Sequence, residues 1–170
     1  MASIDAEQLY CAMRDSLRAT LEDEIRLGTT ALAGIYRGGA WIAERLAQDL
    51  DVALFGVVNI ALHRDDYAKK GLHSQAQPTS LPFSVHGMHI VLVDDVLFTG
   101  RTMRAAINEL YDYGRPACVE LAVLIDRGCR EMPIAASFVG TKMLNVPATE
   151  ILVLQRDSCG ALVFVTEEQV

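Results

Sequence analysis

The chain has 170 residues, of which 51% are hydrophobic and 22% are charged, and its formal net charge is −7. This length and composition predict a single compact domain, residues 1–170, with enough chain for a hydrophobic core. The negative charge disfavours a general nucleic-acid binder, because phosphates repel it at long range, but it is compatible with a local basic face.

The first predicted element is an amphipathic helix over residues 8–26. Its apolar residues recur every four positions and define one buried stripe: Leu9, Met13, Leu17, Leu21 and Ile25. Arg14 and Arg18 fall outside this stripe. We interpret these arginines as part of a solvated face, with contact to RNA as the alternative.

A strand, a glycine-containing loop and a second helix are predicted next. Residues 30–35 form a short apolar run, and Tyr36-Arg37-Gly38-Gly39 follows it. The glycines allow close backbone approach, so this loop can offer N–H groups and the Arg37 guanidinium to an anion. The alternative is a tight turn that needs glycine for its conformation. The helix that follows is predicted to bury Trp41, Ile42, Leu46 and Leu50.

The apolar run over residues 53–62 predicts another strand, and the polar stretch after it predicts a long loop. This loop starts with His63-Arg64-Asp65-Asp66-Tyr67 and lacks periodicity up to Ser80. A loop of this length in a compact domain is usually functional, often as a lid, or else disordered. A solvated charge cluster is the alternative for its ionic residues. Residues 81–83 are expected to return as the second arm of a hairpin.

The stretch from His89 to Asn108 carries the clearest signal for a binding site. Residues 90–93 predict a buried parallel strand, residues 96–100 a loop and residues 101–113 a helix. The N–H groups at the start of a helix lack intrahelical partners, and the helix dipole adds partial positive charge there. This start is therefore a predicted phosphate site, in which Gly100 permits close approach and Thr99 and Thr102 donate hydroxyl hydrogen bonds.

Two adjacent carboxylates, Asp94 and Asp95, end the strand over residues 90–93 in this interpretation. They repel each other, and they lie at the edge where open α/β sheets bind ligands. We expect them to need hydroxyl donors or a cation. The structural alternative is an ordinary turn between strand and helix, with Asp95 as a solvated capping residue.

The last third of the chain changes from alternating strands and helices to short strands. Residues 117–125 predict a buried strand that ends at Asp126. The segment 138–140 follows, and then two short strands over residues 151–155 and 161–165. The chain is therefore predicted to be an α/β sheet domain with a small β-rich appendage.

Charged residues near the start of the chain and scattered cysteines predict a cytoplasmic protein. Asp5, Glu7 and Arg14 precede any long apolar run, so we expect neither a signal peptide nor a membrane span. The four cysteines form no Cys-x-x-Cys pair, and the four histidines have no metal-ligand spacing. We expect buried or incidental thiols and no bound transition metal.

The run VLVDDVLFTGRT at residues 91–102 resembles the phosphoribosyl pyrophosphate (PRPP) motif of type I phosphoribosyltransferases. Within that superfamily, RDD at 64–66, DYGRP at 112–116 and LAVLIDRGCRE at 121–131 resemble the PyrR-type pyrimidine operon regulators, which have uracil phosphoribosyltransferase activity. The similarity extends to about residue 155. It implies a type I phosphoribosyltransferase fold, with a central mainly parallel sheet flanked by helices, a small β-rich hood and a flexible hairpin loop.

The resemblance also implies how PRPP would be held. Asp94 and Asp95 would bind the ribose hydroxyls, and the residues after them would bind the 5′-phosphate: Val96, Leu97, Phe98, Thr99, Gly100, Arg101 and Thr102. Arg37 and Gly38 would face the pyrophosphate, together with Arg64 from the flexible loop. Mg²⁺ would bind mainly through PRPP oxygens and water.

The base would lie against Asp126 to Gly128 and against the backbone near Phe138 to Gly140, the hood segment of the family. The implied reaction converts uracil and PRPP to UMP and pyrophosphate, in a homodimer or higher homo-oligomer. Another pyrimidine or a purine base stays open. An alternative function is a nucleotide sensor that acts on pyr mRNA with weak or vestigial catalysis. Cys129 and Ala135 stand where RNA-binding members have histidine and arginine, which weakens that alternative.

Overall fold

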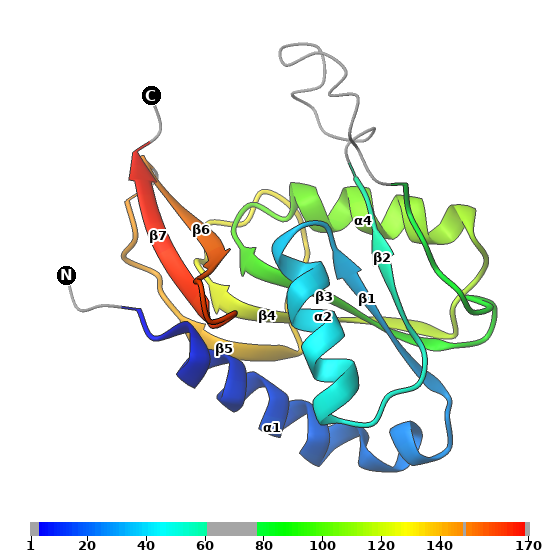
Figure 1. The fold of residues 1–170 in the computed structure, drawn as a ribbon. Coiled ribbons are helices and arrows are strands. Elements are labelled where there is room, and N and C mark those ends of the chain that lie inside the picture. Colours follow the sequence, from blue (N-terminus) through cyan, green and yellow to red (C-terminus); the bar gives the residue numbers. More distant parts are fainter. Residues whose placement is uncertain (1–3, 61–77, 148, 169–170) are drawn as a thin grey trace.

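Five parallel strands form the central sheet of this computed structural model, which describes residues 4–60, 78–147 and 149–168. The order across the sheet is β2-β1-β3-β4-β5 (Figure 1). The strands are β1 (Thr30–Ile35), β2 (Phe55–Val58), β3 (His89–Leu97), β4 (Cys118–Asp126) and β5 (Phe138–Lys142). After β1 the chain adds β2 on one side, and after β3 it adds β4 on the other side. The strand order therefore reverses between β1 and β3. Open α/β sheets bind ligands at the carboxyl edge beside such a switch point.

Helices cover both faces of the sheet. Helices α1 (Ala6–Arg26) and α2 (Gly38–Asp49) lie on one face, and α4 (Arg101–Asp112) lies on the other (Figure 1). Alternate residues of β3 serve the two cores: Val91 and Val93 pack with α1 and α2, whereas Ile90 and Leu92 pack with α4. A sheet buried on both faces needs apolar residues at every position, which explains the continuous apolar runs in the sequence.

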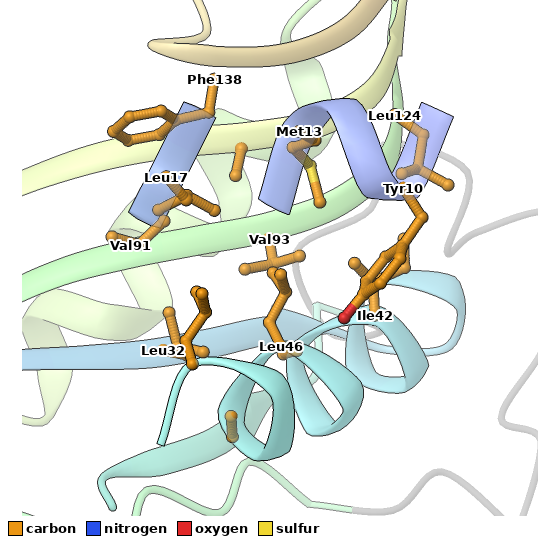
Figure 2. Close-up of a cluster of buried hydrophobic side chains, with 14 of the residues drawn as sticks. Tyr10, Met13, Leu17, Leu32, Ile42, Leu46, Val91, Val93, Leu124 and Phe138 are labelled. Carbon is orange, nitrogen blue, oxygen red and sulfur yellow. The ribbon is translucent and has the colours of Figure 1, made fainter. Parts of the chain in front are cut away.

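Helix α1 begins at a side-chain cap and packs along the sheet. The carboxylate of Asp5 accepts a hydrogen bond from the Gln8 N–H at 3.0 Å. The buried stripe is Ala6, Tyr10, Met13, Leu17 and Leu21, and Figure 2 shows Met13 and Leu17 directed toward β3. The predicted Leu9 and Ile25 are only partly buried, because a repeat of four drifts around a helix that has 3.6 residues per turn.

A separate antiparallel ribbon stands beyond the carboxyl ends of β3 and β4 (Figure 1). It consists of β6 (Glu150–Arg156) and β7 (Leu162–Glu168), and its inner side chains Leu152, Leu154 and Leu162 join the core beneath α1 and α2. The Leu162 N–H donates to the Glu7 carboxylate at 2.8 Å. The predicted β-rich appendage is thus confirmed as this ribbon.

Three predictions about strands are wrong, two of them in extent and the third because no strand forms. The strand that was expected to end before the acidic pair continues through Asp94 and Asp95 to Leu97, since β4 pairs with it as far as Leu97↔Asp126. The strand predicted over residues 53–62 is formed only at β2 within the described residues. The expected hairpin arm at residues 81–83 is not a strand, although Ser80 forms an antiparallel bridge with Val57.

The placement of residues 138–140 in the hood is also wrong. These residues belong to β5, which pairs with β4 in the main sheet. Phe138 is 3% exposed, and its side chain lies in the core with Leu17 and Val91 (Figure 2). The short run of β-branched and glycine residues at 139–141 fits an edge strand as well as a hood, so the sequence pattern did not separate the two.

Candidate active site

The loop after β1 touches β3 at the switch point. A Cβ at Gly39 would overlap the carbonyl oxygen of Val93, and a Cβ at Gly38 would lie 2.6 Å from Oδ2 of Asp95. The two glycines therefore bring the N-terminus of α2 against the acidic pair. Arg37 immediately precedes α2; it is exposed, and its guanidinium lies 5.6 Å from the centre of the Tyr36 ring.

The acidic pair lies on the part of β3 that extends beyond the end of β1. The ladder with β1 ends at Gly34↔Val93, while the ladder with β4 continues past it. Asp94 is 7% exposed, and Asp95 is partly buried and accepts a hydrogen bond from the Val96 N–H at 2.8 Å. Burial raises the pKa of the Asp95 carboxyl, against the lowering effect of hydrogen bonds from the Asp94 side chain and from backbone groups. Donors from a ligand would stabilise the ionised pair.

A short loop over residues 98–100 leads into α4, and the predicted loop over residues 96–100 is too long because Val96 and Leu97 belong to β3. Gly100 precedes the helix with φ 94°, a left-handed conformation that favours glycine. Thr99 and Thr102 are partly buried at this helix start, while the Arg101 side chain turns outward to the Glu131 carboxylate at 2.7 Å. The Leu97 side chain is 1% exposed in the core, so this residue presents only its backbone to the loop.

A turn after β4 closes around the same loop. The Asp126 carboxylate accepts hydrogen bonds from the Arg130 guanidinium at 2.6 Å and from the Gly128 N–H at 2.9 Å. Burial by itself would raise the pKa of Asp126, but these two donors and the nearby Lys142 lower it below its ordinary value. Asp126 is therefore ionised, and its shortest hydrogen bond comes from Arg130. Lys142 at the end of β5 is paired with Asp126 in the ladder between β4 and β5.

Arg127 is buried and joins the loop to the segment before β6. Its guanidinium lies 4.3 Å from the centre of the Phe98 ring, and it donates to the carbonyls of Pro147 at 2.8 Å and Glu150 at 2.9 Å. Cation–π contact and backbone hydrogen bonds replace the water that a buried arginine loses. Phe98 of the loop is therefore in contact with Arg127, whose hydrogen bonds to Pro147 and Glu150 link it to the base of the ribbon.

The structure brings most of the predicted site residues to one edge of the sheet. These are Arg37, Gly38, Asp94, Asp95, Asp126 and the loop of residues 96–102. Phe138 is not among them, because its side chain is in the core. Arg64 lies outside the described residues. Arg130 is an additional residue at this site that sequence reasoning did not single out, and Arg127 entered only as part of the predicted base segment from Asp126 to Gly128. The only signal for Arg130 was an arginine two residues after Gly128, in a turn that follows an acidic strand end.

The described part of the chain, residues 4–60, 78–147 and 149–168, contains no cluster of three or more His, Cys, Asp or Glu side chains arranged for a metal ion. In the same residues, no helix combines the length and the apolar character that crossing a membrane requires.

Comparison with known proteins agrees with this geometry. Residues 4–152 match the phosphoribosyl transferase domain family. The bifunctional protein PyrR of Ralstonia nicotianae is 59% identical over 158 residues, covering 93% of this chain and 90% of the relative. That of Nitrosococcus oceani is 46% identical over 152 residues, covering 88% and 85%.

Solved structures show the same fold at low identity. A hypoxanthine-guanine phosphoribosyltransferase from Bacillus anthracis superposes with a TM-score of 0.65 at 14% identity and covers 85% of each chain. A hypoxanthine phosphoribosyltransferase from Staphylococcus aureus gives 0.59 at 21% identity and covers 87% of this chain and 78% of the other. The type I phosphoribosyltransferase fold is confirmed, and the chain belongs to the phosphoribosyltransferase family, within the group of the PyrR proteins.

Proposed function

We propose that residues 1–170 act as one domain that converts uracil and PRPP to UMP and pyrophosphate, in the cytoplasm. One observation carries this proposal: the Asp94–Asp95 pair lies at the switch point of the sheet, against the glycine-started N-terminus of α2 and just before that of α4. Helix N-termini favour anions, and carboxylates accept hydrogen bonds from hydroxyls. A sugar that carries a phosphate at each end matches this arrangement.

The roles of the residues follow the order of groups along PRPP. Asp94 and Asp95 accept hydrogen bonds from the ribose hydroxyls, and residues 96–102 bind the 5′-phosphate. Arg37 and Gly38, at the start of α2, bind the pyrophosphate. Arg64 remains proposed as a further pyrophosphate contact on the strength of the resemblance alone.

The base is proposed to lie near Asp126. This carboxylate is at the same edge as the acidic pair, and Lys142 of the neighbouring strand ends beside it. The backbone near Phe138 to Gly140 remains proposed as a contact of the base on the strength of the resemblance, whereas the Phe138 side chain packs in the core and is not part of this contact.

The chemistry is a substitution at C1 of the ribose. As the bond to pyrophosphate breaks, positive charge develops on the sugar ring and negative charge on the leaving group. The N-terminal dipole of α2 and the Arg37 guanidinium stabilise the leaving group, while the nearby carboxylates stabilise the ring. A covalent intermediate is not required, because the incoming base nitrogen forms the new bond directly to C1 and loses its proton as the bond to pyrophosphate breaks.

Magnesium is proposed as a cofactor that binds mainly through PRPP. The carboxylate oxygens of Asp94 and Asp95 are hard donors of the kind that suits this ion, and Mg²⁺ usually binds through one or two carboxylates together with substrate phosphates. When bound, it would neutralise charge on the pyrophosphate.

The test is a panel of bases incubated with purified protein, Mg²⁺ and PRPP. We expect UMP and pyrophosphate from uracil, and no comparable product from cytosine, hypoxanthine, guanine or adenine. No turnover of uracil by a protein that still binds UMP would overturn the enzyme function. Turnover of a different base would keep the reaction and change the substrate.

RNA binding is the second proposed function, because the similar proteins from Ralstonia and Nitrosococcus are called bifunctional PyrR. The arginines of α1 give it limited support: Arg14 pairs with Asp15 at 2.9 Å, and Arg18 donates to the Asp49 carbonyl at 2.7 Å. A specific, salt-dependent affinity for the leader RNA of its own operon would establish this function. Equal affinity for unrelated RNA would remove it.

A homodimer or higher homo-oligomer is also proposed, on the strength of the resemblance. Light scattering of the purified protein measures its mass in solution directly, and a single species near 18.6 kDa would contradict this proposal.

A further inference from the structure

Three consecutive carbonyl groups of the loop after β3 accept hydrogen bonds from the turn after β4. The Leu97 carbonyl accepts from the Arg127 N–H at 2.9 Å, and the Thr99 carbonyl accepts from the Glu131 N–H at 3.0 Å. Between them, the Phe98 carbonyl accepts from Nη1 of Arg130 at 2.7 Å. All three peptide units are thereby oriented by one segment, residues 127–131.

Peptide geometry turns this orientation into a binding surface. In a planar trans peptide, the C=O of one residue and the N–H of the next point in opposite directions. The N–H groups of Phe98, Thr99 and Gly100 must therefore point away from the turn after β4. The structure gives these three N–H groups no acceptor among the residues it describes. Since Gly100 precedes α4, they add to the N–H groups of the helix start.

Arg130 is the side chain that holds this arrangement together. Besides Phe98, its guanidinium donates to the Gly128 carbonyl at 2.8 Å, the Ile134 carbonyl at 2.9 Å and the Asp126 carboxylate at 2.6 Å. The side chain is 21% exposed. A planar guanidinium has five donors in a fixed fork, whereas a lysine ammonium has three on a flexible stem. The Arg130 guanidinium donates from this fork to several acceptors at once.

The charge of Arg130 is not what this arrangement needs. Its ion pair with Asp126 neutralises most of the charge, and its donors are directed at carbonyls and at this carboxylate. Attraction of a phosphate by a free positive charge would instead require donors directed at the ligand. The directions of the Arg130 donors therefore favour a positioning role for this side chain over direct electrostatic attraction of a phosphate.

We infer that Arg130 is a positioning residue, which orients the peptide units of residues 97–99 so that the N–H groups of Phe98, Thr99 and Gly100 receive the 5′-phosphate of PRPP. This inference rests on the proposed function and specifies how its phosphate site is formed. Arg130 itself does not touch the substrate.

The first test replaces Arg130 by lysine, which keeps the charge and removes the fork. Arg130→Lys should raise KM for PRPP and Kd for ribose 5-phosphate on the order of 10- to 100-fold, the loss expected from one or two charged hydrogen bonds. KM for uracil is not the discriminating constant, because Asp126, which we propose lies near the base, loses its guanidinium partner in the same variant. A merely structural defect would reduce the active fraction without raising KM for PRPP or Kd for ribose 5-phosphate.

The matched control is Arg115→Lys, because Arg115 is exposed and its carbonyl contacts Gly87 at the opposite edge of the sheet. It should leave both constants unchanged. If Arg130→Lys bound ribose 5-phosphate like the unmodified protein, charge alone would suffice and the positioning role would be overturned.

A second measurement uses the unmodified protein and does not depend on how a variant folds. In ¹⁵N-labelled protein, ribose 5-phosphate should shift the amide signals of Phe98, Thr99 and Gly100 more than those of Leu97 or Arg127. Shifts confined to other residues would overturn the inference while leaving phosphoribosyl transfer intact. Failure of the unmodified protein to bind PRPP or to turn over any base would instead refute the proposed function itself, and the inference with it.

Discussion

Replacing Gly39 by alanine should separate the two segments that form the PRPP site. The new Cβ would overlap the Val93 carbonyl oxygen and lie 3.0 Å from the Asp94 Cα. Both contacts are backbone atoms of a central strand, so neither can rotate away. The N-terminus of α2 must therefore move back from β3.

The size of this movement sets the expected effect. Carbon atoms are in favourable contact at roughly 3.5–4.0 Å, and the overlap with the Val93 carbonyl oxygen is more severe than the contact with the Asp94 Cα, so the helix start must retreat by at least about 1 Å. Overpacking of this kind typically costs about 1–3 kcal/mol of stability. A displacement of ~1 Å at reacting groups can lower turnover on the order of 100-fold. Gly39→Ala should thus lose far more activity than its loss of stability explains.

The assay compares kcat/KM for UMP formation with the free energy of unfolding in urea. Gly28→Ala is the matched control: Gly28 has φ 70° but nothing within 4 Å of its added Cβ, and it lies at the other end of the sheet, before β1. Its strained conformation should cost about 1–2 kcal/mol without loss of kcat/KM below the unfolding transition. Equal activities for the two variants would refute the steric argument.

Three further predictions concern individual side chains. Asp94→Asn combined with Asp95→Asn should abolish UMP formation, while circular dichroism shows an unchanged fold; residual turnover above a few per cent would contradict a direct role. Asp126→Asn should lower stability at pH 7 by about 1–3 kcal/mol, through loss of its charged hydrogen bond to Arg130. Because the folded-state pKa of Asp126 is lowered, this difference from the unmodified protein should be full at neutral pH and shrink as pH falls below about 4. Urea titrations at pH 7, 5 and 3.5 measure it, and a constant difference would exclude the ionised pair as its cause. Phe138→Leu should reduce the free energy of unfolding by about 1–2 kcal/mol and leave KM for uracil unchanged; a raised KM would return this residue to the base site.

The central unit of the fold was predictable because local pattern and tertiary environment agree there. Residues 30–35 and 101–112 adopt the predicted strand and helix, since an apolar run between two covered faces and an amphipathic repeat leave few alternatives. The glycine before α4 was also predictable, because a left-handed residue at a loop end favours glycine. In the loop after β1, the glycines were read as space for an anion, whereas they also give space to the chain's own strand.

The turn after β4 was not predictable in this way. The surroundings of Arg127 and Arg130 could not be predicted, because no local pattern in a loop indicates which carbonyl groups will surround a side chain. Their acceptors come from segments as distant as Phe98 and Glu150. The burial of an arginine depends on those long-range contacts, and the same is true of the assignment of Phe138 to the sheet rather than to the hood.

The β6–β7 ribbon shares no ladder with the five-stranded sheet in the described residues, and it is held to the rest of the molecule by packing and by hydrogen bonds that involve side chains, such as Arg127 to Glu150 and Glu7 to Leu162. An isolated pair of strands is marginally stable in water. The ribbon can therefore open as a unit while the five-stranded ladder stays closed, and its amide hydrogens should exchange with solvent well before those of β3 and β4. Substitutions of outward-facing ribbon residues should act mainly on this local opening equilibrium, whereas substitutions of Leu152, Leu154 or Leu162 should also destabilise the core that the ribbon shares with α1 and α2.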